Sequence, residues 1–287
     1  MDIRLLKFFH ACAEHRSFSR AAEKLSISQP ALSQGIKALE KELKHKLFVR
    51  DRGICLTPQG ERLFTHCERL FTLIENIKDD LASAGKGIKG VIKAGILESI
   101  LLYVFPRIIS EYSSGFPKVT FKFEKAETIP IEKAVLEERL HFGIISRPSS
   151  SKKLEDRKLA EYPHSLFVAT DQKGPLEVLA KSLPLYLLGS WQAEALKHKT
   201  DLFVRFHNIK CLNPINCVAV VRQLVANGLG MAVLPSFVLG QDLRIVESYP
   251  DFRMGLYLIR KGRRRINALA DHFTDFLLAR NLKDHQS

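Results

Sequence analysis

Residues 1–60 repeat apolar positions with the period of an α-helix. The pattern predicts one helix over residues 3–13 and a second over Phe18–Leu25, with Ser17 as its N-cap. A third helix follows after a turn of two residues, since Ser28 can cap it and Pro30 fits its first turn. The inward face of this third helix carries an apolar stripe formed by Leu32, Ile36, Leu39 and Leu43.

The outer face of the third helix is polar. Its side chains are of the kind that reach base edges and phosphates: Gln29, Ser33, Gln34 and Lys37. Two helices joined by so short a turn, the second with such a face, are typical of a helix-turn-helix. Taken alone, the third helix is equally compatible with an ordinary surface helix. The next residues predict a hairpin, or wing, whose Arg50 and Arg52 either contact DNA or are solvated turn residues.

A long helix is predicted over residues 59–87. Its apolar positions follow the a and d spacing of a coiled coil: Leu63, Cys67, Leu70, Ile74, Ile77 and Leu81. A winged helix has little surface to cover so long a stripe. We therefore expect this helix to form a dimer, and the alternative is that it packs on its own domain. Gly85, Gly87 and Gly90 are expected to end the helix and form a hinge.

From Val91 onward, short apolar strands alternate with helices, which predicts an α/β fold with parallel, doubly wound sheets. Strands are expected at Val91–Ile96, Val119–Phe123, Phe142–Ile145, Leu166–Ala169, Leu185–Leu188, Leu202–Phe206, Met231–Leu234 and Leu256–Ile259. Helices are expected near Ile100–Tyr112, Ile131–Arg139, Leu176–Lys181, Asn216–Asn227 and Ile266–Ala279. The pattern indicates two lobes, one made of residues 91–160 and 262–287 and the other of residues 161–261.

Charge and composition narrow the class of protein. The net charge is +13, and the basic excess within residues 1–60 fits a nucleic-acid partner. No apolar run approaches the ~20 residues that span a bilayer, and the N-terminus does not read as a signal peptide, so we expect a cytoplasmic protein without a membrane partner. The five scattered cysteines argue against a disulfide framework or a structural zinc site.

Several segments together are similar to a known family. MDIRLLKFF, SFSRAAEKLSISQPALSQGIKALEKEL and LFVRDRGICLTPQGE resemble the N-terminal domain of LysR-type transcriptional regulators, in the same order and spacing. The resemblance implies a winged helix-turn-helix at residues 1–58 and a linker and dimerisation helix at 59–87. It implies a two-lobed α/β effector domain at 88–287, similar to periplasmic solute-binding proteins.

The resemblance also assigns roles within the DNA-binding domain. It implies that Gln29, Pro30, Ser33 and Gln34 enter the major groove, while Lys37 and the wing arginines contact the backbone. Gln34-Gly35 departs from the family pattern, where a basic or longer polar residue is frequent. Gly35 also weakens the helix by about 1 kcal/mol relative to Ala.

In such two-lobed folds, ligands bind beyond the carboxyl ends of the strands. The expected effector site is formed by Glu98, Ser99, Ile100, Ala126, Glu127, Thr128, Ser146, Ser190, Trp191, Asn216 and Cys217. Ser99 either contacts an anion or only caps a helix, and Trp191 either stacks on a ligand or lies in a core. Glu98 and Glu127 suggest an effector with a cationic or hydroxyl group, or they point outward. Cys217 leaves redox sensing open as an alternative.

The resulting hypothesis is a sequence-specific DNA-binding transcriptional regulator, controlled by a small-molecule effector that binds between two lobes. The expected partners are double-stranded DNA, RNA polymerase, the effector, and further copies of the chain in a dimer or tetramer. A solute-binding transport component would leave residues 1–90 unexplained. An enzyme is not expected, because the sequence has no P-loop, GxSxG or metal-ligand cluster, so no catalytic residues, metal or cofactor are predicted.

Overall fold

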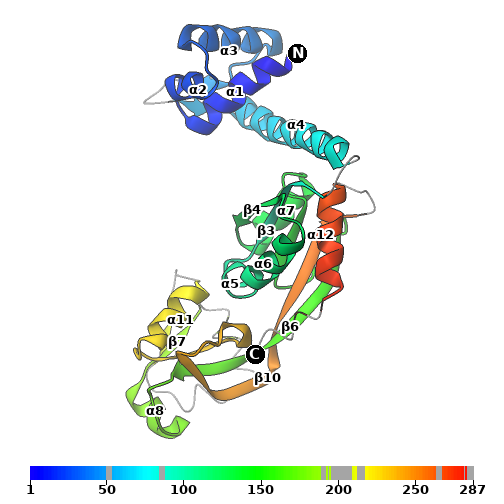
Figure 1. Cartoon of the computed structure of the whole chain (residues 1–287). Helices are drawn as coiled ribbons and strands as arrows, with labels where there is room; N and C mark the ends of the chain where they lie inside the picture. Colours follow the sequence, from blue (N-terminus) through cyan, green and yellow to red (C-terminus); the bar gives the residue numbers. More distant parts are fainter. Residues whose placement is uncertain are drawn as a thin grey trace. The chain divides into compact units, whose positions relative to one another are not determined.

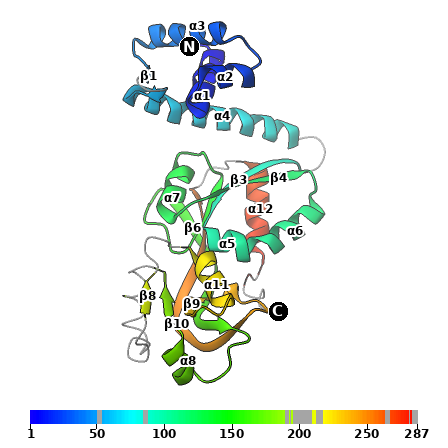
Figure 2. The same ribbon diagram turned by 90° about the vertical axis from the view of Figure 1, so that its left-hand side faces the viewer.

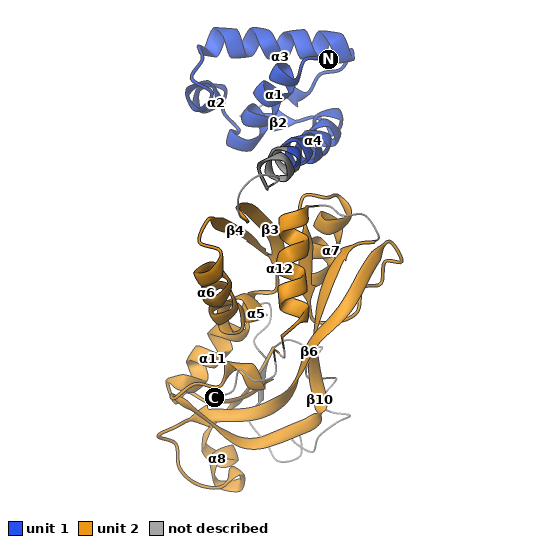
Figure 3. Ribbon diagram, turned by 45° about the vertical axis from the view of Figure 1, so that its right-hand side comes forward, with its two compact units in different colours: residues 1–78 blue, residues 79–287 orange. Residues whose placement is uncertain are grey.

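The structure is a computed structural model that describes residues 1–49, 54–83, 88–188, 192, 194, 209–211, 217–262, 267–280 and 282. It divides into two compact units, residues 1–78 and 79–287 (Figure 3). Each unit contains its own hydrophobic core.

The first unit begins with three helices: α1 (Ile3–His15), α2 (Phe18–Lys24) and α3 (Gln29–Leu43) (Figure 1). The predicted caps are present, since the Ser17 and Ser28 hydroxyls each accept a backbone N–H of the following helix at 3.3 Å. Ser26, in the turn between α2 and α3, has a φ of 54°. This left-handed residue lets the chain reverse within a few residues and completes the helix-turn-helix.

Three of the four predicted stripe residues of α3 are buried, since Leu32 and Leu39 are fully inaccessible and Ile36 nearly so, while Leu43 is half-buried against the same core. Gly35 lies where α3 crosses α1, and a Cβ at this position would be 2.6 Å from the ring of Phe8. The glycine that weakens the helix therefore also allows a close approach of two helices.

A short antiparallel hairpin follows α3, formed by β1 (Phe48–Val49) and β2 (Cys55–Leu56). The long helix α4 (Pro58–Ser83) comes next. Thr57 joins the two, because its hydroxyl donates to the carbonyl of Lys46 at 2.7 Å and accepts the N–H of Gly60 at 3.0 Å. The start of α4 is thereby fixed to the start of the wing.

The second unit is built on one eight-stranded sheet in the order β4-β3-β5-β10-β6-β9-β7-β8. Its strands are β3 (Gly90–Ile96), β4 (Val119–Lys125), β5 (Phe142–Ile145), β6 (Leu154–Ala169), β7 (Leu185–Leu187), β8 (Ile209–Cys211), β9 (Met231–Pro235) and β10 (Leu243–Lys261). We call β3–β5 with their helices the first lobe, and β7–β9 with theirs the second lobe. The predicted strand Leu202–Phe206 lies outside the described residues.

The prediction of parallel sheets is correct only within each lobe. β3 pairs in parallel with β4 and β5, and β7 pairs in parallel with β8 and β9. The lobes are joined by β6 and β10, which are antiparallel to each other and run through both lobes (Figure 2). The full length of these strands was not predicted from the sequence. β6 begins with exposed charged residues such as Asp156 and Lys158, which break the apolar run expected of a buried strand.

Helices cover both faces of the first lobe. The expected helix Ile100–Tyr112 is two helices, α5 (Glu98–Tyr103) and α6 (Phe105–Gly115), because Pro106 has no N–H to continue the first. α12 (Ala268–Leu278) packs with them in one core, while α7 (Thr128–Leu136) packs in another. Gly143 permits the approach of α7, since a Cβ there would lie 2.4 Å from Ile131.

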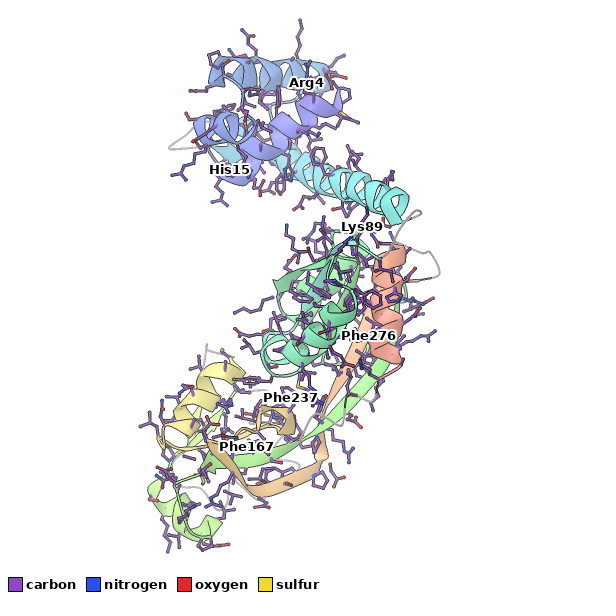
Figure 4. All side chains as sticks on the ribbon, in the orientation of Figure 1. Arg4, His15, Lys89, Phe167, Phe237 and Phe276 are labelled. Atoms are coloured by element: carbon purple, nitrogen blue, oxygen red, sulfur yellow. The ribbon has the colours of Figure 1, made fainter. Side chains whose placement is uncertain are left out.

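The second lobe adds α8 (Leu176–Ser182), α11 (Val218–Ala226) and the 3-10 turn η1 (Ser236–Val238). Phe167 of β6 and Phe237 of η1 are buried in the large core, and both are labelled in Figure 4. The β6–β10 pairing slips between Tyr249 and Arg253, which places the three residues 250–252 in a bulge. This bulge lies where the chain passes from one lobe to the other.

Candidate functional site

Four of the five α3 residues predicted to contact DNA are exposed, namely Gln29, Pro30, Gln34 and Lys37. Ser33 is half-buried. It is one of the residues that line a surface hollow, together with Arg16, Ser17, Phe18, Ser19, Gln29 and Ile54. The Ser19 hydroxyl is 3.4 Å from the amide oxygen of Gln29 and can donate to it. The outer face of α3 is therefore continuous with the start of α2.

Sequence reasoning missed Arg16 and Ser19, which share this hollow with Gln29 and Ser33. Both are exposed and precede or begin α2. The signal was present in the sequence, because the N-cap at Ser17 fixes which residues open α2. In helix-turn-helix proteins the first helix crosses the DNA backbone, so its exposed start is a place for phosphate contacts.

Glu40 connects α3 to the wing. Its carboxylate accepts the backbone N–H of Leu47 at 2.9 Å and contacts the Lys46 ammonium at 2.8 Å. Burial favours a higher pKa for Glu40, but the hydrogen bonds from Lys46 and Leu47 outweigh it and hold the pKa below its usual value. The position of the wing is thus tied to α3. The wing residues Arg50 and Arg52 lie outside the described residues.

The predicted dimer seam on α4 needs one correction. Cys67 is 1% exposed and belongs to the core of the first unit, and burial raises its pKa to about 11. Leu63 and Leu70 are half-buried against the same core. The first half of the stripe therefore covers its own domain, which was the alternative that the sequence left open. The side chain of Leu81 is outside the described residues.

Further along α4 the stripe is accessible. Ile77 is 49% exposed and Ile74 is half-buried. Leu73, which the heptad spacing did not select, is 53% exposed. Among the described side chains of α4, these three therefore give the second half of the helix an accessible apolar surface.

The second unit contains a cavity of about 240 Å³ where its two lobes meet. It is lined by Leu97, Glu98, Ser99, Glu127, Ser146, His164, Leu188, Val218, Pro235, Phe252, Arg253 and Met254. Among the predicted effector residues, the structure brings four to this cavity: Glu98, Ser99, Glu127 and Ser146. They follow the carboxyl ends of β3, β4 and β5, as expected for an α/β site.

Other predicted effector residues lie elsewhere. Ile100 is fully buried in the large core, because it points from α5 into the first lobe. Ala126 packs against the core beneath α7, and Thr128, the first residue of α7, does not line the cavity. Ser190, Trp191 and Asn216 are outside the described residues.

Glu98 is the most heavily engaged polar group in the cavity wall. One carboxylate oxygen is 2.5 Å from the Lys125 ammonium, and the other accepts the Cys217 thiol at 3.3 Å. The hydrogen bond from Lys125 lowers the pKa of Glu98 despite partial burial, and Cys217 adds to this effect. Cys217 therefore contacts a cavity residue without lining the cavity itself.

The residues of β6 and β10 that line the cavity were not predicted from the sequence, and we call them the cavity floor. His164 on β6 is 4% exposed, stacks on Phe252 with ring centroids 4.1 Å apart, and is 3.0 Å from the Phe252 carbonyl oxygen through Nδ1. The bulge on β10 turns Phe252 toward His164, and Arg253 and Met254 follow it in the cavity wall. The only sequence signal is the proline in each strand, Pro163 and Pro250, where regular pairing is interrupted.

A helix-turn-helix with a polar recognition helix, together with an α/β unit that encloses a cavity between two lobes, defines a ligand-responsive DNA-binding regulator. Within the described residues, no group of three or more His, Cys, Asp or Glu side chains is arranged to hold a metal ion. None of the described helices combines the length and the apolar character needed to cross a membrane.

Comparison with known families assigns this regulator to its family. Residues 3–61 match the bacterial regulatory helix-turn-helix protein, lysR family, and residues 85–281 match the LysR substrate binding domain. The HTH-type transcriptional regulator IlvR of Caulobacter vibrioides is 31% identical over 247 residues, which cover 82% of this chain and 83% of that protein. The chain belongs to the LysR family of transcriptional regulators.

Solved structures show the same fold along the chain. CbnR, a LysR family transcriptional regulator, matches with a TM-score of 0.74 at 20% identity, covering 99% of this chain and 100% of that chain. Full-length CbnR complexed with its target DNA matches with a TM-score of 0.73 at 18% identity, over 96% and 99% of the two chains. As a member of this family, the protein regulates transcription by binding DNA through its helix-turn-helix and an effector through its substrate-binding domain, and it is not an enzyme.

Proposed function

We propose that the outer face of α3 reads a specific operator. Gln29, Pro30, Ser33 and Gln34 enter the major groove, and Lys37, Arg16 and the wing residues Arg50 and Arg52 contact the backbone. The exposure of Gln29, Pro30, Gln34 and Lys37 on the face opposite the buried residues Leu32, Ile36 and Leu39 carries this proposal, since these four side chains are not used for packing. Amide side chains such as Gln34 favour adenine, whereas Lys37 supplies a contact that is independent of sequence.

The accessible part of α4 brings two copies of the chain together. Leu73, Ile74 and Ile77 expose an apolar surface that a second α4 can cover. Two recognition helices held in one dimer match two half-sites of an operator, and a tetramer extends this arrangement to two such sites. The resulting dimer or tetramer acts in the cytoplasm, where RNA polymerase and the operator are present together.

The cavity between the lobes is the effector site. Ser99, Glu127 and Ser146 recognise the polar part of the small molecule, and Phe252 and Met254 contact its apolar part. Because the cavity is lined by both lobes, a ligand can favour one lobe arrangement over another. Such differential affinity, rather than tight binding alone, shifts the arrangement of the dimers on DNA and the access of RNA polymerase.

The α3 assignment is tested with the double substitution Ser33→Ala plus Gln34→Ala. We expect the affinity for a duplex selected from a random pool to fall by about tenfold or more, while affinity for unrelated duplexes changes little. Fluorescence anisotropy over a range of salt concentrations measures both affinities. Lys37→Ala is the matched comparison, because loss of a phosphate contact weakens both affinities and lowers the salt slope. Equal losses on both duplexes in the double variant would show that these side chains do not read bases.

A further inference from the structure

The polar groups in the cavity wall differ in whether the protein already engages them. Both carboxylate oxygens of Glu98 have partners, in Lys125 and Cys217. Arg253 donates through Nε to the Pro250 carbonyl at 2.5 Å and lies 3.6 Å from a Glu161 carboxylate oxygen. Glu98 and Arg253 therefore each have an oppositely charged partner within the protein.

Three other polar groups in the wall have no hydrogen-bond or ionic partner among the described residues. Ser99 is only 8% exposed, yet its hydroxyl has no hydrogen bond to any residue in the part of the chain that the structure describes. The same holds for the Ser146 hydroxyl and for the Glu127 carboxylate, again within the described ranges. A polar group that faces a cavity without a protein partner can bind a ligand or water there.

The charges in the cavity wall indicate which sign of charge the ligand should carry. The described lining of the cavity carries two carboxylates, Glu98 and Glu127, against one guanidinium, that of Arg253, which also pairs with Glu161 at 3.6 Å. A ligand carboxylate would face Glu127 directly, whereas a ligand ammonium would donate to Glu127 and to the serine hydroxyls. The charges on the wall therefore favour a cationic ligand.

The rest of the wall is apolar, with Phe252, Met254, Pro235 and Val218 on the side of the second lobe and the crossing strands. The cavity of about 240 Å³ is smaller than the roughly 300–1,000 Å³ of pockets for drug-sized ligands. A matching ligand is a small molecule with one polar end and an apolar body.

We propose that the effector is a small ammonium compound, whose N–H groups donate to the Glu127 carboxylate and the Ser99 hydroxyl while its apolar body packs against Phe252 and Met254. This inference rests on the proposed role of the cavity as the effector site and specifies the chemistry of its ligand.

The test uses the full-length protein and three probes with the same body: 2-phenylethylamine, 2-phenylethanol and 3-phenylpropionate. Thermal shift identifies which probe stabilises the protein, and isothermal titration calorimetry measures its Kd. We expect stabilisation by the amine and a Kd that rises by about tenfold or more in Glu127→Gln, which removes the charge and keeps the shape. Glu177→Gln is the matched control, because Glu177 is also an exposed glutamate at the start of a helix but lies outside the cavity.

Three outcomes would overturn the ammonium proposal. They are stabilisation by 3-phenylpropionate instead of the amine, no binding of either 2-phenylethylamine or the aliphatic 3-methylbutylamine, and an unchanged amine Kd in Glu127→Gln. Binding of the carboxylate would still leave the cavity as the effector site. Sequence-specific DNA binding is measured separately by anisotropy, so failure of the ligand class and failure of the proposed function are distinguishable.

Discussion

The recognition helix and the effector cavity differ in how they are assembled from the chain. The hollow at the start of α2 and α3 is formed by residues between Arg16 and Ile54, within one small unit. The cavity combines loops after three parallel strands with a bulge on β10, and its floor joins His164 to Phe252 across 88 positions of sequence. A surface made from neighbouring residues depends on local caps and turns, whereas a cavity made from distant residues depends on the register of long strands.

Substitution of Phe252, beside His164 in the cavity wall, should destabilise the protein most strongly. Phe252→Ala removes a 7% exposed ring that stacks on His164, and it should lower the free energy of unfolding of the second unit by about 3 kcal/mol. Trp191, the single tryptophan, lies in the second unit, so urea unfolding followed by tryptophan fluorescence reports on that unit. Nonspecific DNA affinity, which depends on the first unit, should remain unchanged.

Phe116→Ala provides the comparison, because Phe116 packs on Tyr112 with ring centroids 4.7 Å apart and does not line the cavity. It should destabilise the second unit but leave the amine affinity intact, whereas Phe252→Ala should weaken both. An unchanged urea midpoint in Phe252→Ala would contradict the structural role of the bulge.

A smaller effect is expected where α3 meets the wing. Glu40→Ala leaves the Leu47 N–H without its acceptor and should destabilise the first unit by about 2 kcal/mol, with a loss of DNA affinity. Glu23→Ala removes the same charge from an exposed position on α2 and serves as the control. Circular dichroism of the helical signal during urea unfolding, together with anisotropy, measures both effects.

The Glu40 effect should also depend on pH. The folded-state pKa of Glu40 is lowered, so its stabilising contribution is complete above its unfolded value of about 4.3 and is lost as the pH falls through the folded pKa. The difference between the wild type and Glu40→Ala should therefore shrink in acid. A difference that stays constant down to pH 2 would show that the carboxylate charge does not contribute.

The smallest effect is expected at Gly35. Replacement by Ala gains about 1 kcal/mol of helix propensity, but the new Cβ requires the Phe8 ring to move, so the two effects should nearly cancel. Thermal unfolding of the first unit should change by only a few degrees in either direction. Gly35→Val adds two further methyl groups at the same contact and should be clearly destabilising. Equal stability of both variants would show that α1 and α3 do not need this close approach.

Much of the structure of the first unit could be predicted from the sequence. Ser17 and Ser28 cap the helices that they were predicted to cap, and the stripe from Leu32 to Leu39 is buried. Caps and stripes involve residues within about four positions of each other, so local sequence determines them. Cys67 is the exception, because heptad spacing cannot tell a partner helix from the helix's own domain.

For the second unit, individual strands could be predicted from the sequence, but the strands that join its two lobes could not. The strands β3, β5 and β9 were predicted nearly to the residue, and the residues after β3, β4 and β5 were expected to share a site, because parallel strands end at one edge of a sheet. The lengths of β6 and β10 were not predicted, since their charged and interrupted segments lack the pattern of buried strands.

Local periodicity, caps and turns were sufficient to predict a helix-turn-helix followed by an α/β domain, whereas the effector-binding role of that domain came from the resemblance to a known family. The tertiary structure was needed to show that Glu98 pairs with Lys125, that Glu127 has no such partner among the described residues, and that His164 and Phe252 close the cavity between them. These contacts follow from strand register and from a bulge, which depend on pairing between distant segments and leave little trace in either segment alone.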